Sequence, residues 1–124
     1  MIDFSNNMLF KLTAIHPSDV QASVQGLLVG GEEIVSAYKA VRDMVIFTNK
    51  RVICINVQGI TGAKKDFTSL PYSKVTAFSV ETAGTFDFDS ELDLWLNGIG
   101  KVRLEFKAKC NITELAQLIG SYVL

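Results

Sequence analysis

Four carboxylates alternate along the run TFDFDSELD and form a candidate site for a ligand or partner. On an extended strand a spacing of two residues places side chains on one face. The run therefore predicts a cation site, a surface for a protein partner, or a solvated strand whose charges protect a sheet edge. An EF-hand calcium loop is excluded, because it requires glycine at its sixth position and counting from Asp87 that position is Leu92. The four acidic residues are Asp87, Asp89, Glu91 and Asp93.

The stretch from 59 to 65, GITGAKK, has the glycines and lysines of a phosphate-binding loop but not their spacing. Gly59 and Gly62 are too close together, and a strand rather than a helix is expected to follow. A phosphate loop holds its anion on backbone N–H groups at a helix N-terminus. The stretch is therefore interpreted as a hairpin loop.

Nucleophilic or metal-assisted catalysis has few candidates in this sequence. His16 is the single histidine, and its neighbour Pro17 places it at the end of a helix, as a turn residue. No glycine-elbow serine, zinc-spaced cluster or nucleotide fingerprint is present. We therefore expect a non-catalytic protein without cofactor or metal. Cys54 and Cys110 have no disulfide-framework spacing, which is typical of a reduced, cytoplasmic protein.

Composition restricts the class of protein further. Hydrophobic residues make up 48% of the 124 residues and charged residues 20%, which is typical of one globular domain. The net charge of -1 argues against nucleic acid as a partner and against a protein held on anionic lipid by charge alone. No apolar run reaches the roughly 20 residues of a membrane span, and the N-terminus lacks the basic start of a signal peptide.

The elements are expected to be organised around a hairpin of 44–47 and 52–57, with Asn49-Lys50 as its loop. This register pairs Phe47 with Val52, and it makes both faces of the hairpin apolar. Antiparallel sheets usually expose one face to water, so the second face needs a helix of the same chain or another subunit. The sequence leaves open which face is core and which is interface. One face holds Val45, Phe47, Val52 and Cys54, and the other holds Met44, Ile46, Ile53 and Ile55.

Two N-terminal helices are candidates for this cover. Apolar residues from Phe4 to Ile15, including Met8, recur at helical spacing and predict the first helix. Ser18 or Asp19 is expected to cap the second. Its apolar stripe is Val20, Val24, Leu27 and Leu28.

The segment 32–107 shows strand and turn patterns, and 111–124 an amphipathic helix that begins at Asn111. In the last hairpin, matching the buried leucines pairs Leu96 with Val102. That register places Trp95 opposite Arg103, a possible cation–π contact. It also places Asp93 opposite Glu105, a repulsive pair that suggests a cation from elsewhere. About seven strands closed by one helix predict a partly open antiparallel barrel.

Several motifs resemble the bacterial pleckstrin-homology (PH-like) domains. These motifs are FTNKR at 47–51, QGITG at 58–62 followed by Lys64-Lys65, LPYSKV at 70–75, and VETAGTFDFDSEL at 80–92. The resemblance implies a mostly β fold of two near-orthogonal sheets with a C-terminal helix. It also implies closed rings of identical subunits, five-fold in single-domain members, and no established enzymatic activity. In eukaryotic PH domains that bind phosphoinositides, several cations lie in the loop between the first two strands. Here that loop is Ala40-Val41-Arg42-Asp43, with one cation beside an acid.

The sequence thus predicts a single PH-like domain over 1–124, with a helical segment at 1–29, strands at 32–107 and a helix at 111–124. We expect a cyclic homo-oligomer that offers Asp87, Asp89, Glu91 and Asp93 to an unidentified protein partner. Met44, Ile46, Ile53 and Ile55 are the expected contacts between its subunits. The alternative is a peripheral lipid- or membrane-associated binding module, which a basic patch at one end of the assembly would favour.

Overall fold

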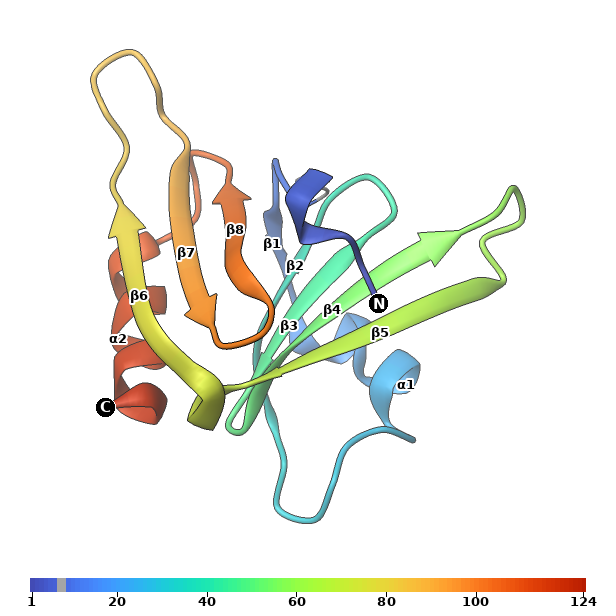
Figure 1. Cartoon of the computed structure of the whole chain (residues 1–124). Helices are drawn as coiled ribbons and strands as arrows, with labels where there is room; N and C mark the ends of the chain where they lie inside the picture. Colours follow the sequence, from blue (N-terminus) through green and yellow to red (C-terminus); the bar gives the residue numbers. More distant parts are fainter. Residues whose placement is uncertain (7–8) are drawn as a thin grey trace.

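The computed structural model describes residues 1–6 and 9–124, and two antiparallel sheets form its framework (Figure 1). The first sheet has the strand order β1 (Thr13–Ile15), β2 (Ile34–Lys39), β3 (Met44–Thr48), β4 (Arg51–Gln58) and β5 (Lys64–Pro71). The second has the order β6 (Val75–Glu81), β7 (Ser90–Leu96) and β8 (Gly100–Phe106). The C-terminal helix α2 (Ile112–Val123) packs against β6, β7 and the 3-10 turn η3 (Tyr72–Lys74). The predicted fold, mostly β with one C-terminal helix, is confirmed.

The N-terminal segment joins the two sheets along one side of the fold. Leu12 donates its N–H to the Glu105 carbonyl at 2.9 Å, and Lys107 donates to the Leu12 carbonyl at 2.9 Å. The chain then continues as β1, where Thr13 pairs with Lys39 of β2. On the other side β5 runs through η3 into β6 without a ladder between them, so the barrel stays partly open.

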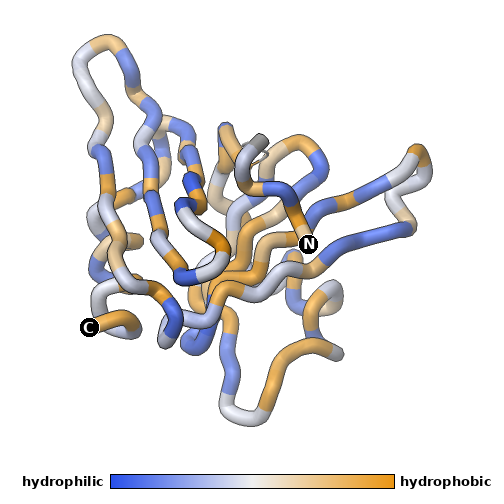
Figure 2. The backbone as a smooth tube through the Cα atoms, viewed as in Figure 1, coloured by the Kyte–Doolittle hydropathy of each residue, from blue (hydrophilic) through white to orange (hydrophobic). Residues whose placement is uncertain are grey.

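The central hairpin has the predicted register and two apolar faces. Phe47 pairs with Val52 and Met44 with Ile55. One face enters the main core between the sheets, and the other enters a second, smaller core. Along the backbone, Figure 2 shows apolar residues concentrated in the middle of the five-stranded sheet.

The chain itself covers the second face. Val20 lies between the turn η2 (Pro17–Asp19) and the short helix α1 (Gln21–Val24), and Val24 ends α1; both valines are fully buried. Together they close a small core that contains Ile46, Ile53 and Ile55. The residues predicted to contact another subunit are thus inside the single chain, with Met44 half-buried beside them. These four side chains do not form an exposed surface, so a second copy on this side would contact the segment that contains Val20 and Val24 instead.

The structure overturns part of the N-terminal prediction. Residues 4–15 do not form one helix: Phe4–Asn6 is a 3-10 turn and Thr13–Ile15 is a strand, while Met8 lies outside the described residues. Hydrogen bonds to β2 and β8 occupy the backbone here, and this pairing outweighs the helical spacing of the apolar side chains. Ser18 and Asp19 do not cap α1, which starts after Val20 without a side-chain cap.

The last hairpin differs from the predicted register by two residues. Leu94 pairs with Val102 and Leu96 with Gly100, and the loop is Asn97-Gly98-Ile99. A tight loop is possible because Gly98 and Gly100 adopt φ values of 85° and 91°. A shift of two keeps every side chain on its face but changes its partner. The expected Trp95–Arg103 and Asp93–Glu105 pairs are therefore wrong, and Asp93 lies opposite Arg103.

The C-terminal helix follows its prediction. Asn111 accepts a hydrogen bond from the Glu114 N–H at 3.1 Å, which caps the helix. Ile112, Leu115 and Ile119 are buried against the main core. In the described part of the chain, no helix combines the length and the apolar character that crossing a bilayer demands.

We expect Ile53→Ala to destabilise the protein by about 2–5 kcal/mol, because it removes buried methyl groups beneath Val20 and Val24 and leaves a cavity. Urea denaturation measures this change. Ile60→Ala is the matched control, since Ile60 is fully exposed, and it should change stability by less than about 0.5 kcal/mol. Equal effects of the two substitutions would contradict burial of this face within the single chain.

Candidate functional site

The loop between β6 and β7 places two phenylalanines in water. This acidic aromatic loop, residues 82–89, projects beyond the end of the three-stranded sheet (Figure 1). Phe86 is 96% exposed and Phe88 is 62% exposed. Burying a phenylalanine is worth about 1.5–3 kcal/mol relative to leaving it in water. In the isolated chain Phe86 lacks almost all of this stabilisation and Phe88 lacks more than half of it, and two exposed phenylalanines in one loop are typical of an interaction surface.

Hydrogen bonds within the loop fix its tip. Gly84 donates its N–H to the Asp87 carbonyl at 2.6 Å. The Asp87 carboxylate accepts from the Asp89 N–H at 3.1 Å, an Asx turn. Both phenylalanines therefore lie on a turn fixed by hydrogen bonds, and each is followed by a carboxylate, Asp87 or Asp89.

The four predicted acidic residues do not share one strand face. Asp87 and Asp89 lie in the loop, because β7 starts at Ser90, and only Glu91 and Asp93 lie on the strand. Asp93 is buried, and its carboxylate accepts two hydrogen bonds from Arg103, at 2.9 and 3.0 Å. Asp93 thus belongs to an internal ion pair, and the surface acids are the other three.

The carboxylates around Arg103 repel one another. Burial, and then the charges of Glu81, Asp87 and Glu105, raise the pKa of Glu91, although Arg103 opposes this shift. Burial and the charges of Asp89 and Asp87 likewise raise the pKa of Glu105. This end of the three-stranded sheet therefore carries more negative charge than Arg103 balances.

A groove of about 660 Å³ lies where β1, the β2–β3 turn, the end of β4 and Lys107 meet. Its cations are Lys11, Lys39, Arg42 and Lys107, and its larger apolar side chains are Phe10, Ile15, Val41 and Val57. We call it the basic groove. An adjacent hollow of about 420 Å³ adds Ile60 and Lys65. The chain thus has a positive, partly apolar surface distinct from the acidic loop.

Sequence reasoning missed the basic groove. Of the four cations in the groove it considered only Arg42, which it treated as neutralised by the neighbouring Asp43, and the other basic patch it weighed was Lys64, Lys65 and Lys74. In the structure the Asp43 carboxylate accepts from the Val57 N–H at 2.9 Å, while Arg42 donates to the Gly59 carbonyl. The remaining cations come from three distant segments, so no local pattern could have indicated the groove. Lys11 even has a φ of 58°, in the left-handed region.

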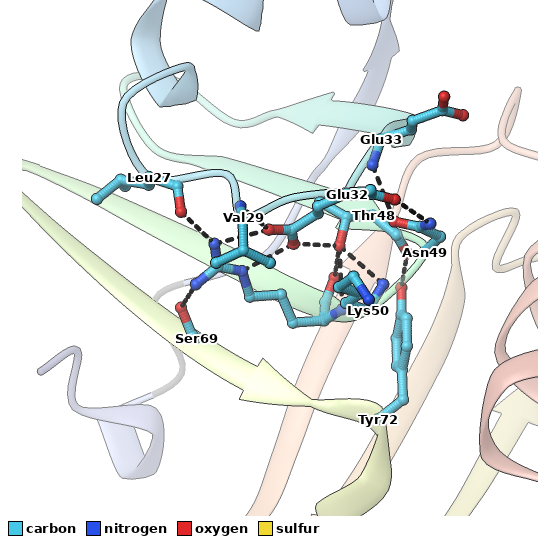
Figure 3. Close-up of polar contacts among 11 residues, drawn as sticks. Leu27, Val29, Glu32, Glu33, Thr48, Asn49, Lys50, Ser69 and Tyr72 are labelled. Atoms are coloured by element: carbon cyan, nitrogen blue, oxygen red, sulfur yellow. Dashed lines mark hydrogen bonds and ion pairs between the residues drawn. The ribbon is translucent and has the colours of Figure 1, made fainter.

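The FTNKR motif is structural. Arg51 donates to both carboxylate oxygens of Glu32 at 2.9 Å, and the Thr48 hydroxyl donates to Glu32 at 2.7 Å (Figure 3). The Tyr72 hydroxyl donates to the Thr48 carbonyl at 2.6 Å, and Asn49 donates to the Gly31 carbonyl at 2.9 Å. We call this set the Glu32–Arg51 network. It joins the segment before β2 to the end of the hairpin.

Protein donors keep the buried Glu32 ionised. Its side chain is fully inaccessible, and burial alone would raise its pKa. The hydrogen bonds from Arg51, Thr48 and the Val29 N–H, together with the charge of Arg51, outweigh burial, and the pKa of Glu32 is lowered. Arg51 also donates to the Leu27 carbonyl at 2.7 Å and to Ser69 at 3.0 Å.

The side chains considered for catalysis lie apart from one another. The imidazole of His16 contacts the Ser18 hydroxyl at 2.7 Å, at the turn before α1. Cys54 is buried in the main core, where desolvation raises the pKa of its thiol to about 12, the condition of an unreactive cysteine. Among the residues with described positions, no three His, Cys, Asp or Glu side chains are grouped so that they could hold a metal ion. Residues 59–63 form the loop between β4 and β5, as predicted for a hairpin, and Lys64 and Lys65 are the first residues of β5.

Comparison with known proteins identifies relatives over nearly the whole chain. Residues 3–123 match the family model described as "Bacterial PH domain". The Bacillus subtilis protein YjqA is 38% identical over 120 residues, which are 95% of this chain and 96% of that protein. YozO of the same organism is 33% identical over 100 residues, 81% of this chain and 86% of that protein.

Solved structures agree with this assignment. A Shewanella loihica protein with a pleckstrin-homology domain has a TM-score of 0.82 and 35% identity, and the match covers 93% of this chain and 99% of that one. A pleckstrin-homology domain from Shewanella amazonensis has a TM-score of 0.69 and 40% identity, and the match covers 89% and 90% of the two chains.

Arg51→Met should destabilise the protein by about 3 kcal/mol at pH 7, because it leaves the Glu32 carboxylate buried without its cation. Because the pKa of Glu32 is lower in the folded than in the unfolded state, the ionised carboxylate stabilises the fold at pH values above the unfolded-state pKa. This stabilisation is lost as the pH falls through the folded-state pKa. The difference in the free energy of unfolding between wild type and variant should therefore become smaller below about pH 4. Urea denaturation from pH 7 to pH 3 measures it, and a difference independent of pH would contradict the role given to Glu32.

Glu105→Gln should stabilise the protein at pH 7 and leave its stability nearly unchanged at pH 3. The pKa of Glu105 is raised in the folded state, so ionisation opposes folding once the pH exceeds the unfolded value. Thermal unfolding at the two pH values provides the measurement. Glu33→Gln, at an exposed carboxylate on another part of the surface, is the control. Destabilisation of Glu105→Gln at pH 7 would refute mutual repulsion among these acids.

Proposed function

The chain belongs to the bacterial PH-domain family, and on this premise we propose that it is a non-catalytic domain that assembles into a cyclic homo-oligomer and binds another protein through a polar surface. The observation that carries the proposal is the acidic aromatic loop, with Phe86 and Phe88 exposed beside Asp87 and Asp89. Aromatic anchors with a polar rim are characteristic of protein interfaces.

Assembly would multiply this surface. In a closed ring each loop recurs once per subunit, so weak individual contacts with a symmetric or repetitive partner combine into higher avidity. The second face of the central hairpin no longer supplies the reason to assemble, since Val20 and Val24 cover it. The outer surfaces, and the exposed phenylalanines first among them, supply it instead.

A second candidate function is peripheral binding to anionic lipid. It is favoured by Val41, 94% exposed, and Ile60, fully exposed, which line one hollow with Lys39, Arg42 and Lys65. Exposed aliphatic tips beside several cations suit a surface that inserts shallowly and contacts headgroups. Each cation near an anionic surface contributes about 1 kcal/mol.

The proposal predicts that Asp87→Lys/Asp89→Lys loses partner proteins that the wild-type chain recovers from a native lysate. Asp19→Lys/Glu33→Lys, with the same charge change at exposed positions elsewhere, is the matched control and should recover them. Light scattering on purified wild type should give a mass of several chains. Equal recovery of all partners by both variants, or a single-chain mass at high concentration, would argue against the corresponding part of the proposal.

Vesicle sedimentation tests the lipid alternative. Vesicles of phosphatidylcholine with anionic phosphatidylserine, at low salt, should not retain the protein if its function is binding to proteins. Retention that is lost in Val41→Asp/Ile60→Asp would favour the second candidate over the first.

A further inference from the structure

We propose that the acidic aromatic loop of one copy docks in the basic groove of a second copy. This inference rests on the self-assembly proposed above and names the surfaces that make the contact. It follows from the complementary chemistry of two surfaces that the single chain leaves unused.

The charges of the two surfaces are opposite. The loop carries Asp87 and Asp89, and Glu91 lies at its base. The groove presents Lys11, Lys39, Arg42 and Lys107. The lining contains one acid, Asp43, whose carboxylate accepts hydrogen bonds from Val57 and Asn56, so four cations stand against one carboxylate there. Lys11 also interacts with Glu105 of the same chain, which leaves Lys39, Arg42 and Lys107 as the main cations of the groove. Opposite potentials speed association and fix the orientation of the two partners.

The apolar parts of the two surfaces match as well. Phe86 and Phe88 need a desolvated site, and the groove offers Phe10, Ile15, Val41 and Val57 between its cations. Its volume of about 660 Å³ falls within the roughly 300–1,000 Å³ typical of ligand-binding clefts. An anionic small ligand would need the cations but not this apolar lining, which is why an aromatic acidic segment is the better occupant.

The loop does not occupy the groove of its own chain. Phe86 is 96% exposed, and the loop and the groove are built from different elements: the loop joins β6 to β7, and the groove lies around β1, the β2–β3 turn and β4. A contact between unlike surfaces is heterologous, so each added copy brings one further loop and one further groove until the assembly closes. The geometry is thus consistent with a ring and does not require the buried hairpin face.

The test uses two full-length variants, one for each surface. Phe86→Ser/Phe88→Ser alters the loop, and Lys39→Glu/Arg42→Glu alters the groove. Each should raise the apparent dissociation constant of the assembly by about tenfold or more, as loss of a central anchor or charge pair does. Analytical ultracentrifugation over a concentration series measures this change. Lys74→Glu/Lys101→Glu, at exposed lysines outside the groove, is the control and should assemble like wild type.

Mixing the two variants gives the sharpest test. The loop variant keeps an intact groove and the groove variant keeps an intact loop, so one competent contact remains between unlike chains. The mixture should form a pair of one chain of each kind and no larger assembly, and raising the salt concentration should dissociate it. Circular dichroism and urea denaturation of each variant establish that both are folded.

Each result separates this inference from the proposed function. A wild type that stays a single chain at every concentration overturns self-assembly and this contact together. An assembled wild type that neither variant weakens overturns the loop-to-groove contact alone. Retention of the protein on phosphatidylserine vesicles through Lys39 and Arg42, with assembly unchanged in Lys39→Glu/Arg42→Glu, assigns the groove to a membrane and also overturns the contact.

Discussion

The structure depends on one constraint, a central hairpin whose two faces are both apolar. A sheet of this kind is stable only if something covers each side. The three-stranded sheet and α2 cover one side, and the main core lies between them. Val20 and Val24 cover the other, so that Ile46, Ile53 and Ile55 are inaccessible to water without a second chain.

The second cover must be held in place, because η2 and α1 together are short and a helix of four residues has little stability of its own. The Glu32–Arg51 network supplies this restraint. It binds the segment that follows α1, through the Leu27 carbonyl, the Val29 N–H and Glu32, to the end of the hairpin. Buried ion pairs rarely add much net stability, but the bidentate pair and the hydrogen bond from Arg51 to the Leu27 carbonyl tie the segment to the hairpin turn at several points. The network thus specifies where the cover sits.

Because both hairpin faces are used internally, the surfaces left for function are at the rim. The acidic aromatic loop extends from one sheet, and the basic groove forms where β1, the β2–β3 turn and β4 meet. Within the three-stranded sheet, the Asp93–Arg103 pair removes one acid from the surface. Burial first, and then the charges of the neighbouring carboxylates, raise the pKa of Glu91 and of Glu105, so some repulsion among these acids persists in the single chain. A cationic partner would relieve it.

The sequence by itself determined the elements whose patterns are local. Two apolar runs on either side of Asn49-Lys50 predicted the central hairpin with its register. Asn111 and the stripe Ile112, Leu115 and Ile119 predicted the final helix. The family motifs indicated the PH-like fold. Local patterns failed where distant partners compete for the backbone. Pairing with β2 makes Thr13–Ile15 a strand, Leu12 bonds to Glu105 of β8, and two glycines with positive φ accompany the shifted β7–β8 register.

Only the tertiary structure decided which residues meet across the fold. In the folded chain Val20 and Val24 cover the second hairpin face, and Asp93 forms an ion pair with Arg103. Lys11, Lys39 and Lys107 line one groove. These residues are far apart along the chain. Electrostatic and apolar contacts depend on distance in space, and residues far apart in the sequence come close only when the backbone folds. Local sequence patterns therefore cannot predict these contacts.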